Sequence, residues 1–436
     1  MNSEQVPPGT AVDPPAATTT KNKQRKRLVG IDAARGLALI GLMAVHILPE
    51  TNEVTHAPTL VFSIVNGNSA ALFALLAGVG LALSTGGSTP HQGRRMRGDR
   101  AGLAVRAALI GFIGLVVAAI SPEDPPAYSI LVYYAVFFLL TIPFLHLSPR
   151  VLFGTAAVFG IVAPVLMQKL EPVLPSTSAS NHTLVTLFTE PAGTAAELLL
   201  TGVYPALPYM TYLLVGLGLG RLDLRSTRTQ AIIAGTGALL ALSAQLLSTV
   251  LLRVAGGYQA LLASDGLSPE ELDEALTYST GELPDTSGWW LTIATGHTNA
   301  PLAIASSLGI GLLVLGVFLL LGARAGRWLA PLAAMGAMTL TLYTAHLIAL
   351  APEVHYDDPE LWFALHLGVA AVAAWFWTRH HDKGPLETVV GRAVKGTRTM
   401  VTDGAPGTYP GGTDNTTPDS VSRDITRGSG TDPVAR

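Results

Sequence analysis

This chain of 436 residues has no cysteine and few charged residues. Without cysteine it has neither disulfides nor thiolates, which excludes a cysteine nucleophile and any thiolate metal site. Asp, Glu, Lys and Arg together make up 13% of the residues, against roughly 25% in a typical soluble domain. Hydrophobic residues make up 49%, and the mean hydropathy is +0.43. This composition predicts a protein whose solvent is largely the lipid bilayer.

Long apolar runs recur along the chain at the length that a membrane-spanning helix requires. About 20 mostly apolar residues in helical conformation cross the hydrocarbon core. We therefore expect an all-α polytopic membrane helix bundle with about ten transmembrane helices. The expected spans lie near residues 29–49, 58–83, 101–120, 128–147, 151–168, 197–219, 229–252, 298–322, 329–350 and 360–378. We find neither an internal repeat nor a pair of broken helices of the kind that transporters carry.

Lys and Arg are concentrated in every second loop. Basic loops face the cytoplasm, so this alternation predicts that both chain ends are cytoplasmic in a multi-pass protein of the plasma membrane. Two long outer connections, 169–196 and 253–297, carry one basic residue each, at a membrane edge. The basic loops are 93–100, 148–150, 221–228 and 323–327, and the loops without Lys or Arg are 49–57, 121–127 and 351–360.

The chain divides into three regions. We expect a polar, disordered cytoplasmic tail over residues 1–27, a transmembrane domain over 28–395, and a disordered cytoplasmic tail over 396–436. Both tails are poor in apolar residues and rich in polar residues, Gly and Pro, so neither can bury a core.

Ionisable residues within the expected spans point to a functional interior, because their burial in lipid is costly. In the first span Asp32, Arg35 and His46 recur at helical spacing and share one face. One interpretation is a binding site. The alternative is an Asp–Arg pair that neutralises itself at the helix end, with a histidine that reaches the outer surface.

Further polar residues lie at a similar depth in other spans. They are Asn66 and Asn68 in the second span, Tyr343 and His346 on one face of the ninth, and His56 and His297 near the outer surface. We expect these residues and His46 to line one cavity in the outer half of the bundle. Each residue alone could be a structural hydrogen-bonding group. No metal site is predicted, because no HxxxH spacing is present, and we assign no role to His91, His146, His182, His355, His380 and His381.

Four short motifs resemble known membrane proteins over roughly residues 28–395. The first resembles the opening of the heparan-α-glucosaminide N-acetyltransferase catalytic family and of the related bacterial YeiB-like proteins, and the other three resemble the YeiB-like group. The motifs are Gly30-Ile-Asp32-Ala-Ala-Arg35-Gly36, Thr201-Gly-Val-Tyr204-Pro205-Ala-Leu-Pro208, Leu340-Thr-Leu-Tyr343-Thr-Ala-His346 and Gly384-Pro385-Leu386-Glu387.

The resemblance implies acyl transfer across the membrane. In the acetyltransferase family, acetyl-CoA is taken from the cytosol and the acetyl group passes to an amino sugar on the other face. A histidine in the first outer loop is at the centre of the reaction, and His56 has the matching position. The family tends to carry an asparagine late in the first span, where this chain has His46. This leaves open whether His46 replaces the hydrogen bonds of the amide or reflects a different acceptor.

The resemblance therefore predicts an acyltransferase that modifies an extracytoplasmic sugar or glycan with an acyl group from cytosolic acyl-CoA. His56 is expected to be the general base or transient acyl carrier, assisted by His46 and Asn68, since neutral imidazole suits proton transfer near pH 7. The expected acceptor-binding residues are Asp32, Arg35, Asn66, Tyr343, His346 and His297. The expected CoA-binding residues are Arg35, Arg94, Arg95, Arg97 and Arg106, although loop arginines can serve topology alone.

Two other functions use the same polar interior. A small-solute transporter would employ the histidines as a relay and a binding site, and a scaffold or sensor would need polar groups only to pack its helices. For each function the lipid bilayer is the surrounding partner, no nucleic acid is expected, and a homodimer is left open.

Overall fold

The computed structural model describes residues 28–52, 54–122, 124–278 and 283–403, and within them it is helical with no β-strand. In this part of the chain seven helices are long and apolar enough to cross a membrane, or up to nine if each of two bent helix pairs is one span. The shorter apolar segment Ile130–Phe144 is a further helix. The predicted all-α polytopic fold is confirmed, whereas the count of about ten spans is not.

The candidate spans coincide with the predicted apolar runs. The seven continuous ones are α1 (Val29–Ile47), α2 with α3 (Leu60–Val65, Asn68–Ser84), α4 (Gly93–Ile120), α6 (Pro149–Leu170), α10 (Thr227–Thr249), α13 (Pro301–Ala325) and α16 (Pro359–Thr378). The first bent pair joins α8 (Pro191–Ala196) and the π-helical segment Glu197–Thr201 to α9 (Ala206–Leu219), and the second joins α14 (Ala330–Gly336) to α15 (Thr339–Leu350). The short segment contains α5 (Ile130–Thr141).

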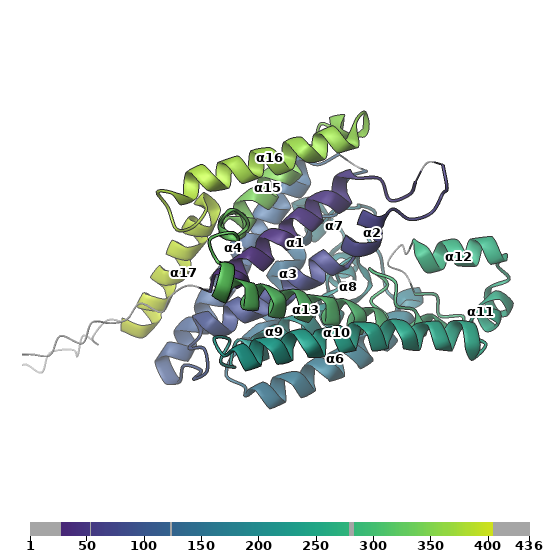
Figure 1. The fold of residues 1–436 in the computed structure, drawn as a ribbon, viewed down its shortest axis with the longest axis horizontal. Coiled ribbons are helices and arrows are strands. Elements are labelled where there is room, and N and C mark those ends of the chain that lie inside the picture. Colours follow the sequence, from purple (N-terminus) through teal and green to yellow (C-terminus); the bar gives the residue numbers. More distant parts are fainter. Residues whose placement is uncertain (1–27, 53, 123, 279–282, 404–436) are drawn as a thin grey trace, which may run out of the picture.

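Helix α1 is central in the bundle and packs closely because it has small residues on several faces (Figure 1). A side chain at Gly30 would collide with the backbone of α13, and one at Gly36 would collide with the backbone of α14. On the other side of this contact, Gly336 lies against the carbonyl of Asp32. In a membrane, where lipid offers no hydrophobic drive between helices, such close backbone contact supplies the packing energy.

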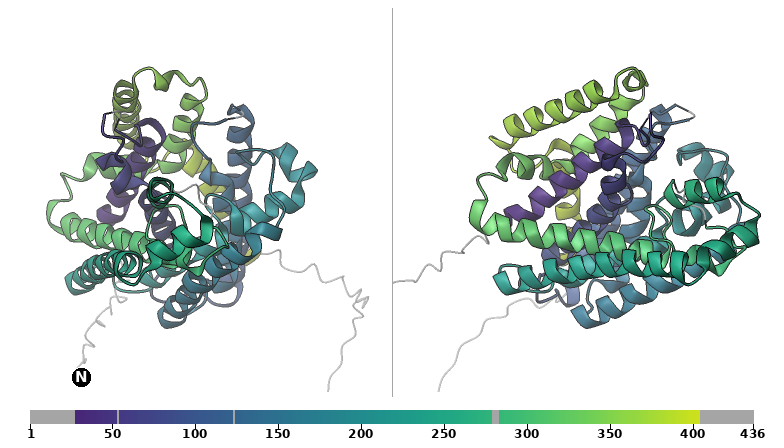
Figure 2. Two further views of the ribbon diagram at one scale, coloured as in Figure 1. Left: turned by 90° about the vertical axis from the view of Figure 1, so that its right-hand side faces the viewer. Right: turned by 45° about the vertical axis from the view of Figure 1, so that its right-hand side comes forward.

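Hydrogen bonds connect the predicted outer segments at one end of the bundle. The Asn181 amide donates to the carbonyl of Ala127 at 3.2 Å and accepts from the backbone N–H of Ser129 at 2.8 Å. The side chain of Gln168, near the end of α6, donates to the carbonyls of Pro284 and Ser287. The short helices α11 (Gly257–Asp265) and α12 (Pro269–Thr277) lie at this end too (Figures 1 and 2). This arrangement agrees with the predicted orientation, in which the loops poor in Lys and Arg lie together on one side of the membrane.

Helix α17 (Pro385–Asp403) lies at the opposite end and packs against the first turns of α4 (Figure 1). The buried carboxylate of Asp99 joins the two helices, at 3.1 Å from the Arg398 guanidinium and 2.7 Å from the His91 ring. Helix α17 continues past the boundary that we expected at residue 396, because this packing covers its apolar side. The expected tails over residues 1–27 and 404–436 lie outside the described residues.

The Gly384–Glu387 motif secures the broken span α14–α15, whose two helices meet at 75°. At the start of α15 the carboxylate of Glu387 accepts from the backbone N–H groups of Leu340 and Thr341, at 2.6 and 3.2 Å. It also accepts from the Thr341 hydroxyl at 2.6 Å. A helix N-terminus leaves N–H groups without intrahelical partners, so Glu387 supplies a cap that α15 does not make itself.

Glu387→Ala should lower the free energy of unfolding by about 2 kcal/mol, because buried donors lose their acceptor. Glu387→Gln keeps one acceptor oxygen and should cost less. The measurement is thermal unfolding in detergent, with Glu274→Ala on the exposed face of α12 as the matched control. Equal melting temperatures for Glu387→Ala and the control would contradict the role of Glu387 as the cap of α15.

Candidate active site

A large cavity opens at the α17 end of the bundle and extends toward the outer half. Its volume is about 1410 Å³. At its mouth the lining comes from α17 and from predicted cytoplasmic connections, including Ser88 and Arg225. Farther in, the walls are Leu42 of α1, Phe73 of α3 and Tyr343 of α15. A long ligand that enters at the α17 end can therefore extend well into the bundle.

The lining of this large cavity has an excess of positive charge. Asp32 and Arg35 lie 3.3 Å apart on α1, and Arg35 also donates to the carbonyl of Leu76. The basic lining residues are Arg35, Arg106, Arg225, Lys383, Lys395 and Arg398, and the acidic ones are Asp32, Asp223, Asp382 and Glu387. Six cations against four anions favour a polyanionic ligand.

Three histidines from separate helices form a hydrogen-bonded chain beside the deep end of this cavity, where Tyr343 lies. Nδ1 of His46 on α1 lies 3.2 Å from Nε2 of His346 on α15, and the two rings are stacked. Nδ1 of His346 lies 2.8 Å from Nδ1 of His366 on α16. The other end of the chain is Nε2 of His46, which is buried without a hydrogen-bond partner among the described residues. A neutral imidazole nitrogen without a partner can accept a proton.

Tyr343 connects this histidine chain to the large cavity. Its ring lines the cavity, and its centroid lies 6.2 Å from the centroid of His46 and 6.4 Å from that of His346. The side chain is buried. A phenol at this place can donate a hydrogen bond to a group that reaches the end of the cavity.

His297 approaches the same region from the outer loop before α13. Its ring packs edge-on against Tyr204 at 5.5 Å, and it is close enough to His46 for the two to interact electrostatically. Burial lowers the pKa of His297 to about 4. Both His297 and Asn299 have positive φ, 64° and 53°. Such strained backbone at non-glycine residues is concentrated at functional sites.

A second polar group lies behind Tyr204, in a part of the sequence to which we assigned no role. Nε2 of His182 lies 3.2 Å from the hydroxyl of Tyr133 and 3.8 Å from the carboxylate of Glu197. Burial lowers the pKa of His182, and Glu197 opposes that shift. These residues hold the π-helical segment against α5.

The structure brings together only part of the predicted site. His46, Tyr343 and His346 are adjacent, with His297 close by, but of these four residues only Tyr343 lines the large cavity. Asp32, Arg35 and Arg106 line this cavity too. Asn66 and Asn68 lie at the break between α2 and α3 and line a different, smaller cavity. The reason is the break itself, where Gly67 at φ 71° redirects the chain.

His56 and three of the predicted CoA-binding arginines lie apart from the large cavity. His56 is exposed in the first outer loop, where its carbonyl accepts a hydrogen bond from Tyr278 at 3.5 Å. Arg94, Arg95 and Arg97 are exposed in the first turns of α4 and are not among the residues that line the cavity.

His366, Lys383, Lys395 and Arg398 are not among the site residues predicted from the sequence. His366 lies within the predicted span 360–378, so the cost of an ionisable group in lipid was the signal that could have identified it. No such signal marks Lys383, Lys395 and Arg398. They line the cavity only because α17 packs against α4. Among the described residues, no group of three or more His, Asp or Glu could hold a metal ion.

A family model described as heparan-alpha-glucosaminide N-acetyltransferase, catalytic, matches residues 27–250. The match covers 224 residues, just over half of the chain. It includes α1 to α10 and therefore His46 and Arg35, but it ends before the helices that carry His346 and His366. The comparison with curated proteins gives no match.

The lowered pKa of His297 predicts a loss of stability in acid. Below about pH 6.5 the unfolded chain binds a proton that the folded chain excludes, so stability falls as the pH drops from 6.5 toward 4. His297→Asn removes this titration and tolerates positive φ. Its melting temperature in detergent should fall less over this window than that of the wild type. The exposed His380→Asn serves as control, and parallel curves for all three proteins would contradict the burial of a neutral His297.

Proposed function

Because the chain belongs to the heparan-alpha-glucosaminide N-acetyltransferase catalytic family, we propose that it transfers an acyl group from cytosolic acyl-CoA to a sugar or glycan outside the cytoplasm. The observation that carries this proposal is the large basic cavity that leads from the α17 end to Tyr343 and the histidine chain. It is a route for a donor that enters from one side and reacts near the other.

The size and charge of the cavity suit acyl-CoA. Pockets for drug-sized ligands measure roughly 300–1,000 Å³, and this cavity of about 1410 Å³ has room for a longer molecule. The phosphates of CoA would interact with the cationic side chains near the mouth, such as Arg106 and Arg398, because charge-assisted hydrogen bonds to phosphate are strong. The apolar walls formed by Leu42 and Phe73 suit the thioester arm.

The histidine chain supplies the base for the transfer. The acceptor hydroxyl or amine attacks the thioester carbonyl while its proton passes to Nε2 of His46. The C–S bond then breaks, and the thiolate takes this proton from His46 to leave as free CoA, which returns the imidazole to its neutral form. His346 and His366 orient His46 and share the positive charge, since each hydrogen bond in the chain can shift its proton toward the next ring. Tyr343 is the candidate donor to the oxyanion.

His56 is the competing candidate for the base, from the family resemblance. Because His56 is exposed in the outer loop, it is better placed to contact the acceptor as it enters than to act as the base at the end of the donor cavity. Nε2 of His46 is buried, and its ring has partners that can share charge and lies next to Tyr343, which lines the cavity. These features support His46.

A transporter is the second candidate, and one observation favours it. Contrary to our expectation, the structure contains two bent helix pairs, and transporters bind substrates at such breaks. However, the N-terminus of α15 is already occupied by the Glu387 carboxylate. Only the break before α9 would be available to an anionic solute, which makes a paired site less favourable.

A pair of variants distinguishes the two bases. With purified protein, an acyl-CoA and a panel of hexoses and hexosamines, His46→Ala should lower kcat by about 10² or more, as the loss of a general base does. His56→Ala should change kcat by less than about threefold under the same conditions. The measurement is release of the free CoA thiol.

The opposite ranking of the two variants would return the base to His56. Absence of thiol release by the wild type across all donors and acceptors, together with solute flux in proteoliposomes, would replace the acyltransferase by the transporter.

A second pair tests the donor cavity. Arg106→Gln removes a lining cation and should raise KM for acyl-CoA about tenfold with a smaller change in kcat, since a charged hydrogen bond contributes roughly 1.5–3 kcal/mol. Arg94→Gln, in the same helix but outside the cavity, should leave KM unchanged. Equal effects of the two substitutions on KM would show that general charge, and not this cavity, attracts the donor.

A further inference from the structure

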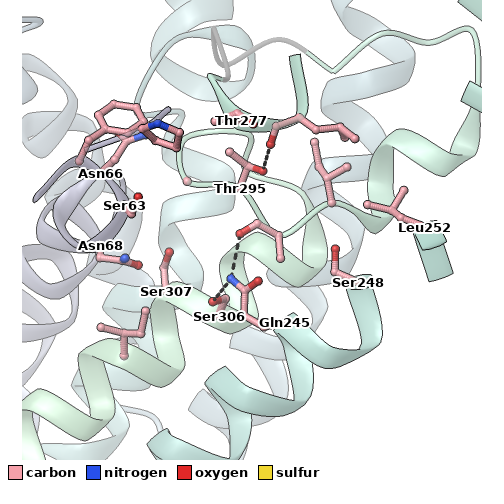
Figure 3. Close-up of a pocket in the computed structure, with 17 residues that line it drawn as sticks. Ser63, Asn66, Asn68, Gln245, Ser248, Leu252, Thr277, Thr295, Ser306 and Ser307 are labelled. Atoms are coloured by element: carbon pink, nitrogen blue, oxygen red, sulfur yellow. Dashed lines mark hydrogen bonds between the residues drawn. The ribbon is translucent and has the colours of Figure 1, made fainter. Parts of the chain in front are cut away.

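A smaller cavity lies at the outer end of the bundle and shares no lining residue with the large one. It has a volume of about 270 Å³ and lies between the α2–α3 break, α10 and α13 (Figure 3). Its roof consists of residues 276–277 and 293–296 from the long outer connection. Nothing in the proposed donor site uses this cavity.

Polar but uncharged groups dominate the walls of the smaller cavity. None of its 17 lining residues is Asp, Glu, Lys, Arg or His. Figure 3 shows hydroxyl and amide side chains from opposite walls that surround the same space. They are Ser63, Asn66, Asn68, Gln245, Ser248, Thr277, Thr295, Ser306 and Ser307.

Two of the amides are held in place by their N–H groups. The Gln245 amide donates to the hydroxyl of Ser306 at 3.0 Å and to the carbonyl of Ala294 at 3.4 Å, and the Asn68 amide donates to the carbonyl of Ile64 at 2.9 Å. An amide oxygen accepts up to two hydrogen bonds. The fixed donors therefore leave these oxygens to accept from a ligand that is rich in O–H groups.

The smaller cavity lies next to the histidine that approaches the chain from outside. The backbone of Gly67 is in contact with that of Gly296 and His297. A side chain at Gly67 would collide with the backbone of Gly296 and His297, and one at Gly296 would collide with the backbone of Asn66. His297 follows directly after the roof of the cavity, and its ring faces Tyr204 and the region of His46. The smaller cavity therefore ends at the residue before His297, and the ring of His297 lies near the proposed base.

We propose that the smaller cavity binds one uncharged sugar ring, and that this ring is the acyl acceptor. The second part rests on the proposed function. The cavity volume of about 270 Å³ lies just below the roughly 300–1,000 Å³ of pockets for drug-sized ligands, which suits a single ring. An ammonium or carboxylate group would find no counter-charge among the lining residues. The attacking group is then a hydroxyl, and the products are a sugar ester and the free CoA thiol.

Equilibrium binding to the full-length protein in detergent, without acyl-CoA, tests the site. The probes are methyl α-glucopyranoside, glucosamine in its ammonium form at pH 6, and glucuronate, and the measurement is a saturation-transfer NMR titration. The neutral glycoside should bind at least tenfold more tightly than either charged sugar. Equal affinities for the three sugars would overturn the proposal.

Three variants locate the binding site. Ser63→Phe fills the cavity and should weaken binding of the neutral glycoside at least tenfold, whereas Ile64→Phe, at the next position but outside the lining, should not. Gln245→Glu introduces a carboxylate of the same shape and should reverse the preference in favour of glucosamine. Unchanged binding in Ser63→Phe would exclude this cavity as the site.

The proposal and the function on which it rests can fail separately. Binding that follows these predictions without any release of CoA thiol keeps the sugar site and removes its role as acceptor site. Thiol release that depends on added sugar, with a KM for that sugar unaffected by Ser63→Phe, keeps the acyltransferase and overturns the sugar site.

Discussion

The contact between Glu387 and the start of α15 determines much of the geometry of the candidate site. In hydrocarbon every backbone donor must find a partner inside the protein, and a helix that begins at a break in the middle of a span leaves several without one. The Glu387 carboxylate supplies those partners from α17. Because of this cap, α15 can turn away from α14 and present Tyr343 and His346 toward α1. The same α17 forms part of the wall of the large cavity.

In the proposed function the two cavities serve the two substrates. The large one is basic, opens among the predicted cytoplasmic connections and ends near the histidine chain. The smaller one has no charged lining residue and lies under the predicted outer connection, where its lining residue Gly296 precedes the strained His297. With the predicted orientation, a donor and an acceptor that differ in charge would each enter from their own side of the bilayer.

Hydrophobic periodicity was enough to predict where the apolar spans lie, because the length of a span is fixed by the thickness of the membrane. The pairing of His46 with His346 followed from depth and helical face. Other features depend on tertiary contacts that no local pattern encodes. Asn66 and Asn68 have the predicted depth but face another cavity, since Gly67 turns the chain between them.

The arginines show the same limit on the cytoplasmic side. Arg94, Arg95 and Arg97 were predicted to contact the donor because of their charge, but α4 starts well before its apolar part and carries them away from the cavity. The cations that line the mouth instead, such as Lys395 and Arg398, lie on either side of residue 396, where we placed the start of a disordered tail. Their positions follow from the packing of α17 on α4 and from the Asp99–Arg398 ion pair.

The central claim is that the thioester of the donor reaches the histidine chain. A structure with a non-hydrolysable acyl-CoA analogue measures this directly, as the distance from Nε2 of His46 to the carbonyl carbon that replaces the thioester. We expect the pantetheine arm to follow the large cavity past Phe73. The distance should leave room for the attacking atom of the acceptor, with the nitrogen within about 3 Å of that atom or one water away. An analogue that ends near the mouth, or one whose carbonyl lies against His56 in the outer loop, would contradict it.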